Sequence, residues 1–217
     1  SEASRQVFDR LGVFPADFDV DAVLAVAEGQ DVVGVTHVLG DLVAKSLLVH
    51  DRTTGRYRLL ETIRLFAVQQ LERTGALADA TERLRAHVVA RAREASRART
   101  WLSASTAARS RDDLPNVRLA FEASLAADDV GAAVDIALGI STLWRNAVSY
   151  EEGRAWVAEL LARDLGDADR LWAHLLAADV ALGSGSPRAL RHAADHATSL
   201  AESRRMRSSW AAVASAM

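Results

Sequence analysis

The spacing of hydrophobic residues changes twice along the first part of the chain. Helical spacing comes first and gives way to two short β-type runs, Leu47–His50 and Arg56–Leu60, on either side of a turn at Asp51–Gly55. Helical spacing then returns and stops at Gly75, since glycine readily takes the left-handed geometry that ends a helix. The predicted helices of this part are 3–11, Asp19 or Asp21 through Glu28, 32–46 and 61–73. Three helices, a hairpin and a fourth helix predict a winged-helix domain at residues 1–77, within the usual size of a small domain.

From Asp79 onward only helical spacing remains, broken by short turns. The predicted helices are about 80–99, 113–127, 130–146, 150–163, 168–182, 187–203 and 206–217. Short connections predict antiparallel neighbours, and a run of such pairs predicts an α-solenoid. Glu152–Arg163 and Arg188–Ser199 lie roughly 36 residues apart, near the tetratricopeptide period of about 34. We therefore predict a mainly α protein: a winged helix with one β-hairpin, then a tetratricopeptide-like helical repeat at 78–217 that is truncated at its C-terminus.

Composition argues against a strongly basic nucleic-acid-binding protein and against a membrane protein. Half of the residues are hydrophobic, and the formal net charge is −3, so no overall basic field exists to attract nucleic acid. The chain has no cysteine, no signal-peptide pattern and no long apolar run, so we expect a cytoplasmic protein with no membrane contact. Lys45 is the only lysine, a bias that favours a bacterial source. The helical pattern runs to both ends, as in an excised fragment.

Motifs for enzyme chemistry are absent from the sequence. The pair Lys45-Ser46 lacks the glycines that let backbone amides approach phosphate in a P-loop. His192 and His196 are one helical turn apart, but Ala193 stands where a zinc protease needs glutamate, and no third ligand is identifiable, so a solvated helix face is the better interpretation. The pair Asp112-Asp113 precedes a predicted helix, where it would cap free amides. We predict no catalytic, cofactor or metal residues here, and no enzyme.

DNA binding is the alternative that a winged helix raises. The helix at 32–46 would enter the major groove, yet Val32–Ala44 contains no Arg, Lys, Asn or Gln to donate to bases or phosphates. Arg52, Arg56 and Arg58 of the wing could reach a DNA backbone. These residue types disfavour direct DNA contact and favour a wing that docks against protein. A DNA-binding winged helix with a helical dimerisation or effector domain stays open as the alternative.

Several segments carry a family resemblance. They are Phe8-x-x-Leu11-x-Val13-Phe14, Phe18-Asp19, Leu42-Val43-x-Lys45-Ser46-Leu47, Tyr57–Arg64, Leu114–Ala120 and Glu151-Glu152-Gly153-Arg154-x-Trp156. Together they resemble the winged helix and the first tetratricopeptide-like helices of bacterial STAND regulators, the NB-ARC-type signal-transducing NTPases found in LuxR-like transcriptional regulators. The resemblance implies a P-loop NTPase core elsewhere in the parent chain, with ATP or ADP as its ligand, and an effector on the repeat surface that is a protein or a small molecule.

One departure from that family falls at the junction of wing and helix. Many members carry Met-His-Asp there, with a histidine that approaches nucleotide, whereas this chain has Leu59, Leu60 and Glu61. A leucine cannot donate to a phosphate. We expect Glu61 to cap the following helix or to pair with an arginine. The candidate interdomain or regulatory residues are Arg56, Arg58, Leu60, Glu61 and Arg64.

The function that follows from the resemblance is a non-catalytic relay. The winged helix would couple the repeat sensor to the NTPase core of the same parent chain, and a ligand on the repeats would shift how the winged helix packs on that core.

Overall fold

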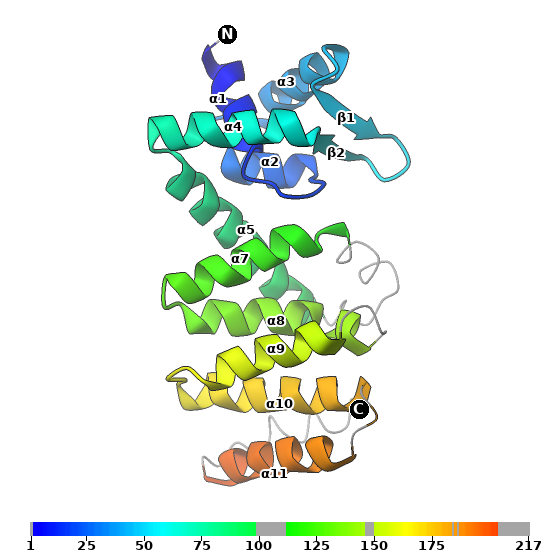
Figure 1. The fold of residues 1–217 in the computed structure, drawn as a ribbon, viewed down its shortest axis with the longest axis vertical. Helices are drawn as coiled ribbons and strands as arrows, with labels where there is room; N and C mark the ends of the chain where they lie inside the picture. The colour runs from blue at the N-terminus through cyan, green and yellow to red at the C-terminus, as the bar shows by residue number, and fades with distance from the viewer. Residues whose placement is uncertain (1, 99–111, 146–149, 184, 186, 204–217) are drawn as a thin grey trace. The chain divides into compact units, whose positions relative to one another are not determined.

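A computed structural model describes residues 2–98, 112–145, 150–183, 185 and 187–203 (Figure 1). These residues divide into two compact units. The first unit holds α1 to α4, the larger part of α5, and α7; the second holds the end of α5 and α8 to α11. The helix predicted at 206–217 lies outside the described residues. The predicted domain boundary after residue 77 stays a prediction.

The first unit contains the predicted hairpin between helices. Its elements are α1 (Glu2–Leu11), α2 (Val20–Val26), α3 (Val32–Ala44), β1 (Leu48–Asp51), β2 (Arg56–Leu59), α4 (Glu61–Thr74), α5 (Leu77–Ala98) and α7 (Leu114–Ala126). Strands β1 and β2 are antiparallel, in a register that pairs Leu48 with Leu59 and Asp51 with Arg56. Phe18 adds a single bridge to Tyr57 through two backbone hydrogen bonds of 2.9 and 2.8 Å. The prediction of a mainly helical protein with one β-hairpin is confirmed.

Aspartates begin two of these helices. The Asp19 carboxylate accepts from the Ala22 amide at 2.8 Å and starts α2, and Asp31 accepts from the Gly34 amide at 2.7 Å and starts α3. Each bond satisfies an amide that has no partner within the helix. The two caps fix where α2 and α3 start, and α3 is the helix that precedes the wing.

The core of the first unit is apolar and continuous. Helices α1 to α3 contribute the fully buried Leu11, Val23 and Leu39, and the hairpin contributes Leu48 and Leu59. Helix α1 ends against α4 at Gly12, where an added Cβ would lie 2.8 Å from the Cβ of Ala67, so this crossing needs a residue without a side chain. The hairpin is thus anchored by its own leucines and has a defined orientation on the helices.

The second unit is a succession of packed helices. After the end of α5 it contains α8 (Val130–Arg145), α9 (Tyr150–Leu161), α10 (Asp167–Gly183) and α11 (Pro187–Ser203). Helix α10 packs against α8, α9 and α11, and α8 also packs against α9. Trp144 of α8 is buried and meets Trp156 of α9 edge to face, with ring centroids 5.6 Å apart. Among the described helices, none is both long enough and apolar enough to cross a membrane.

Candidate functional site

Helix α3 presents a weakly polar face to solvent. Val33 on this helix is 76% exposed, and Val32 is exposed beside it. The hydroxyl of Thr36 donates to the carbonyl of Val32 at 2.7 Å, and His37 lies 3.8 Å from the carboxylate of Asp41. The exposed side chains of α3 therefore offer few free donors for base edges, as its residue types predict.

The cations of this region lie around the end of α3 and along the wing. Lys45, at the C-terminal cap of α3, and Arg52, in the wing turn, are exposed and form no ion pair with a described residue. Arg58 of β2 is 63% exposed and lies 3.8 Å from Asp17, a separation at which an exposed pair contributes little. These three exposed cations, at the end of α3, in the wing turn and on β2, are available to an anionic partner.

The acid of the wing turn is already engaged. The carboxylate of Asp51 accepts from the Thr53 amide at 2.8 Å and from the Thr54 hydroxyl at 2.9 Å. The bond from the Thr53 amide is the largest cause of a lowered Asp51 pKa, and the Thr54 hydroxyl adds to it. These bonds shape the turn that carries Arg52.

Arg56 occupies a different environment from its neighbour Arg58. Its side chain is 5% exposed; the guanidinium donates to the Asp17 carbonyl at 2.6 Å and to the carboxylate of Asp113 at the start of α7. Burial raises the pKa of Asp113, and the Arg56 charge offsets part of that rise. Arg56 thus anchors the wing within the first unit and is not open to a ligand.

Asp113 does not have the predicted role as a helix cap. It stands at the cap position of α7, but its side chain makes no capping hydrogen bond and is turned to Arg56 instead. The prediction that Asp112-Asp113 caps α7 is therefore wrong for Asp113. The carboxylate gains more from a hydrogen bond to the charged guanidinium than from one to a neutral amide. Burial removes water from both charged groups, so each of them needs the other as a partner.

The junction of wing and α4 holds the other candidate residues. Leu60 is the N-cap residue of α4, half-exposed, and cannot cap through its side chain. Glu61 and Arg64 form a two-bond pair at 2.9 and 2.8 Å, as expected for Glu61. The hydrogen bond from Arg64 lowers the pKa of Glu61, and the reciprocal bond raises the pKa of Arg64. The regulatory role of these residues stays a prediction.

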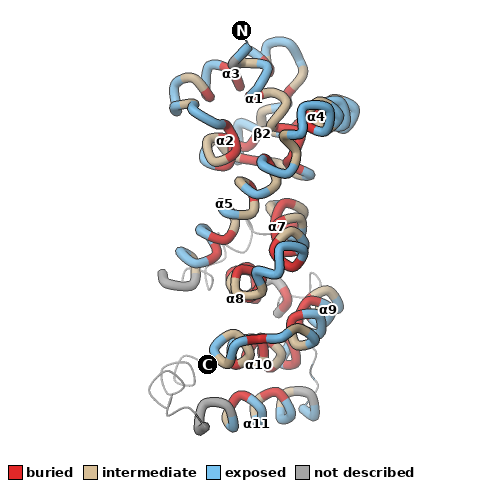
Figure 2. Tube along the Cα trace, turned by 90° about the vertical axis from the view of Figure 1, so that its left-hand side faces the viewer, coloured by how far each residue is buried: buried red, intermediate tan, exposed pale blue. Residues whose placement is uncertain are grey.

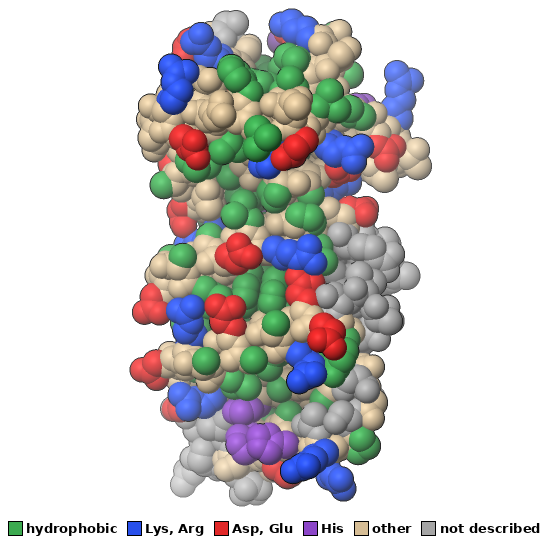
Figure 3. Space-filling view, in the orientation of Figure 1, with side chains coloured by type: hydrophobic (Ala, Val, Ile, Leu, Met, Phe, Trp, Pro, Cys, Tyr) green, Lys and Arg blue, Asp and Glu red, His purple; other side chains and the backbone are tan. Residues whose placement is uncertain are grey.

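Helix α4 is mostly exposed, as Figure 2 shows. Leu65 and Phe66 of this helix are 48% and 51% exposed. The Phe66 ring lies near Phe8 of α1, with ring centroids 6.4 Å apart. Figure 3 shows hydrophobic side chains at the surface in the region of α4. Large apolar side chains gathered on one helix suit a protein contact.

The histidines of α11 have a neighbour that the sequence does not reveal. The rings of His192 and His196 lie 4.4 Å apart, and His174 of α10 lies 5.0 Å from His196. In the part of the chain that the structure describes, no three His, Cys, Asp or Glu side chains have the geometry to hold a metal ion.

Comparisons with known proteins agree with this fold. Residues 1–72 match the family model described as a winged helix-turn-helix domain, which confirms the predicted winged helix. The chain is 33% identical over 165 residues to proteins of Mycobacterium tuberculosis (strain ATCC 25618 / H37Rv) and Mycobacterium bovis (strain ATCC BAA-935 / AF2122/97) that carry the name HTH-type transcriptional regulator. The match covers 74% of this chain and 19% of each relative, so the chain spans about a fifth of their length. No solved structure matches it.

Proposed function

We propose that this chain is part of a transcriptional regulator and that its winged helix contacts DNA through Lys45, Arg52 and Arg58. The match of residues 1–72 to the winged helix-turn-helix family and the names of the mycobacterial relatives support this function. They do not support the expectation, drawn from the residue types of α3, that direct DNA contact is disfavoured. The observation that carries the proposal is that these three cations are exposed around one hairpin, while Arg56 is buried.

The exposed side chains of α3 and the wing also indicate whether binding to DNA depends on its sequence. Phosphate contacts from the wing orient a protein on the duplex, but sequence is read by donors and acceptors in the groove. The exposed polar side chains of α3 are chiefly Thr36, His37 and Asp41, and each of these has a partner within the helix. Binding is therefore dominated by phosphate contact, depends steeply on salt, and discriminates little between sequences.

Fluorescence anisotropy with a labelled random-sequence duplex over a range of salt concentrations tests this function. Replacing Lys45, Arg52 and Arg58 together by alanine should reduce the slope of log affinity against log salt by about 3, or about 1 for each lost phosphate contact. Arg73→Ala removes an exposed cation near the other end of α4 and is the matched control. No binding by the unmodified chain at low salt, or an equal loss in the control, would contradict DNA contact.

A second candidate function rests on Leu65 and Phe66. We propose that the winged helix belongs to a STAND-type regulator, and that the exposed face of α4 docks against the NTPase core of the parent chain, whose ligand is ATP or ADP. In this reading α8 to α11 form a tetratricopeptide-like sensor for a protein or small-molecule effector. A bacterial regulator of this kind acts in the cytoplasm.

The test of the second candidate uses the full-length parent. Phe66→Asp should speed nucleotide exchange, because a charge on the docking face of α4 weakens its contact with the NTPase core that binds the nucleotide. Deleting the repeats should also change exchange. Thr62→Asp, which places the same charge at another exposed position of α4, is the control. Unchanged exchange in both Phe66→Asp and the truncation would contradict the relay and would leave the DNA test unaffected.

A further inference from the structure

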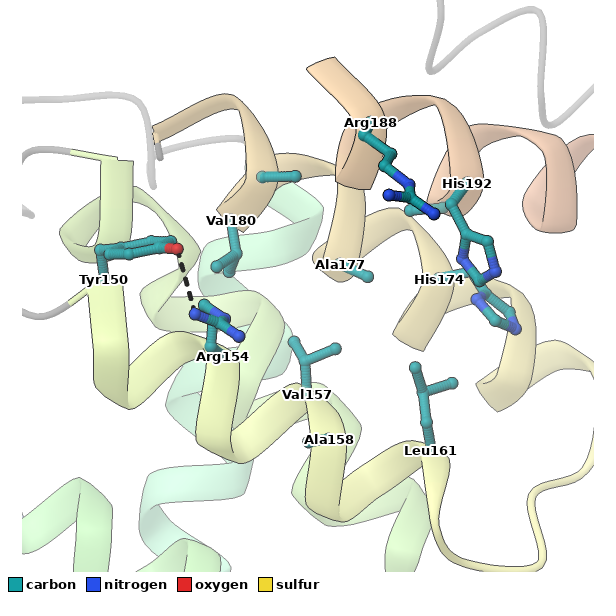
Figure 4. A pocket seen from close by; sticks show the side chains of 12 residues that line it. Tyr150, Arg154, Val157, Ala158, Leu161, His174, Ala177, Val180, Arg188 and His192 are labelled. Carbon is teal, nitrogen blue, oxygen red and sulfur yellow. Dashed lines mark hydrogen bonds between the residues drawn. The ribbon is translucent and has the colours of Figure 1, made fainter. Parts of the chain in front are cut away.

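A cavity of about 670 Å³ lies in the second unit, between α9, α10 and α11. Its size falls within the range of small-molecule pockets, roughly 300–1,000 Å³. The described residues that line it are Tyr150, Arg154, Val157, Ala158, Leu161, His174, Ala177, Val180, Ala181, Arg188, His192 and Ala193 (Figure 4). The three helices therefore border a half-open cavity large enough for an organic molecule.

The inner surface of this cavity is apolar. Val157 from α9, Val180 from α10 and Ala193 from α11 are all buried, and small alanines fill much of the remaining lining. An apolar group placed there would leave water and lose no hydrogen bond, so burying it is favourable. The cavity is suited to a hydrophobic ligand body.

The polar side chains of the cavity are donors and cations, with no acid among the described lining residues. Arg154 Nη1 donates to the Tyr150 hydroxyl at 3.4 Å, and its guanidinium carbon lies 5.8 Å from the Tyr150 ring centroid. Figure 4 shows Arg154 on α9 and Arg188 on α11 at the cavity. Neither guanidinium forms an ion pair with a described acid. Both keep donors free for an incoming anion.

Histidines add further hydrogen-bond donors to the cavity. His174 and His192 line the cavity, and His196 lies next to both. Burial lowers the pKa of His174, and the nearby positive groups of His196, Arg170 and His192 lower it further. Neutral imidazole still has one N–H to donate.

We propose that this cavity binds a small organic anion, with its apolar body against Val157, Val180 and Ala193 and its anionic group held by Arg154 and Arg188. Carboxylate, sulfonate and phosphate share the required chemistry, since each accepts several hydrogen bonds from a guanidinium. A cavity of about 670 Å³ has the size of a small-molecule site. The proposal goes beyond DNA binding and does not depend on it.

Fluorescence titration with two matched dyes tests the proposal on the whole 217-residue chain. Anilinonaphthalene sulfonate carries an apolar ring system and an anion, and phenylnaphthylamine has the same rings without the anion. The variant Arg154→Gln/Arg188→Gln should lose at least about tenfold in affinity for the sulfonate, because it loses charge-assisted hydrogen bonds. Its affinity for the neutral dye should change less than twofold.

Arg191→Gln is the control, because Arg191 is exposed on the same helix as Arg188 and does not line the cavity. An equal loss in this control would show a long-range effect of net charge and overturn the site. Equal affinity of the two dyes for the unmodified chain would show apolar binding alone and would also overturn it.

Displacement of the sulfonate dye separates the possible ligands. Decanoate should displace the dye, whereas decanol and inorganic phosphate should displace it much less, because each has only one of the two features that the cavity matches. Displacement by phosphate alone would show a plain anion site. Displacement only by a peptide with a free C-terminal carboxylate would assign the cavity to a protein partner. Either result would overturn the proposal.

Discussion

The guanidinium of Arg56 on β2 donates to the carboxylate of Asp113 at the start of α7, 57 positions later in the chain. The same guanidinium donates to the carbonyl of Asp17, before α2. One buried cation thus joins three segments: the wing, the segment that leads into α2, and α7. Because a buried charge without a partner is strongly unfavourable, this contact fixes the wing in place.

Removing Arg56 should therefore destabilise the first unit. Arg56→Met leaves the carboxylate of Asp113 buried without its counter-charge, and we expect the free energy of unfolding to fall by about 3 kcal/mol. Arg58→Met is the matched control on the same strand, and its exposed side chain predicts a change below about 0.5 kcal/mol. Urea unfolding followed by circular dichroism measures both, and equal effects would contradict the anchoring role of Arg56.

A double variant separates the ion pair from packing. Asp113→Leu combined with Arg56→Met removes both charges and keeps apolar volume, so it should recover at least about 1 kcal/mol of the loss seen in Arg56→Met. The same unfolding measurement applies. A double variant less stable than Arg56→Met alone would show that the two residues contribute independently.

The sequence does not predict that Arg56 is buried while Arg58 is exposed. Both residues occupy the same face of a regular strand by alternation, so the sequence treats them alike as wing cations. Their environments differ because Asp113 reaches β2 from a helix far along the chain, and no local pattern encodes that approach. The hairpin itself was predictable, since its turn and its two β-type runs are adjacent in sequence.

The same reasoning applies to His192 and His196. Their spacing on α11 predicts that they share a helix face, and that is correct. The interpretation of that face as merely solvated misses the cavity, because the cavity also needs His174 from α10 and Arg154 from α9. Helix bounds follow from local periodicity, whereas a pocket depends on how separate helices pack.

Gly153 provides a prediction for the second unit. A Cβ at this position would lie 2.7 Å from the ring of Trp144, which is buried and cannot move aside freely. We expect Gly153→Ala to reduce stability by about 1–3 kcal/mol through overpacking. Gly40→Ala on α3, where nothing lies within 4 Å, is the control and should stabilise by about 0.5–1 kcal/mol. Thermal unfolding of the two variants should show shifts of opposite sign.

His87 of α5 predicts a dependence of stability on pH. Burial is the main reason that its pKa lies below 6.5; Arg91 lowers it further, while Asp19, Asp113 and Asp21 oppose the change. The unfolded chain therefore takes up a proton before the folded chain as the pH falls. Stability should decrease as the pH drops below about 6.5 and should level off below the folded-state pKa.

The contribution of His87 to this pH dependence is measured by comparing two proteins. Unfolding curves are recorded across this pH range for the unmodified chain and for His87→Gln. The difference in free energy of unfolding between the two should shrink as the pH falls. His37→Gln removes an exposed histidine of α3 and is the control, expected to leave the profile unchanged. A parallel profile for His87→Gln and the unmodified chain would contradict the role given to burial.

Asn116 of α7 makes a second connection to the segment before α2. Its amide nitrogen donates to the Asp17 carbonyl at 2.8 Å, and its oxygen accepts from the Ala16 amide at 3.2 Å. In Asn116→Leu the Asp17 carbonyl keeps its bond from Arg56, but the Ala16 amide loses its acceptor, so we expect a loss of about 1–3 kcal/mol. Hydrogen exchange should show faster exchange at Ala16, with little change at Tyr57, whose amide donates to Phe18. Faster exchange at both amides would mean that α7 supports the whole wing, whereas unchanged exchange at Ala16 would contradict the bond.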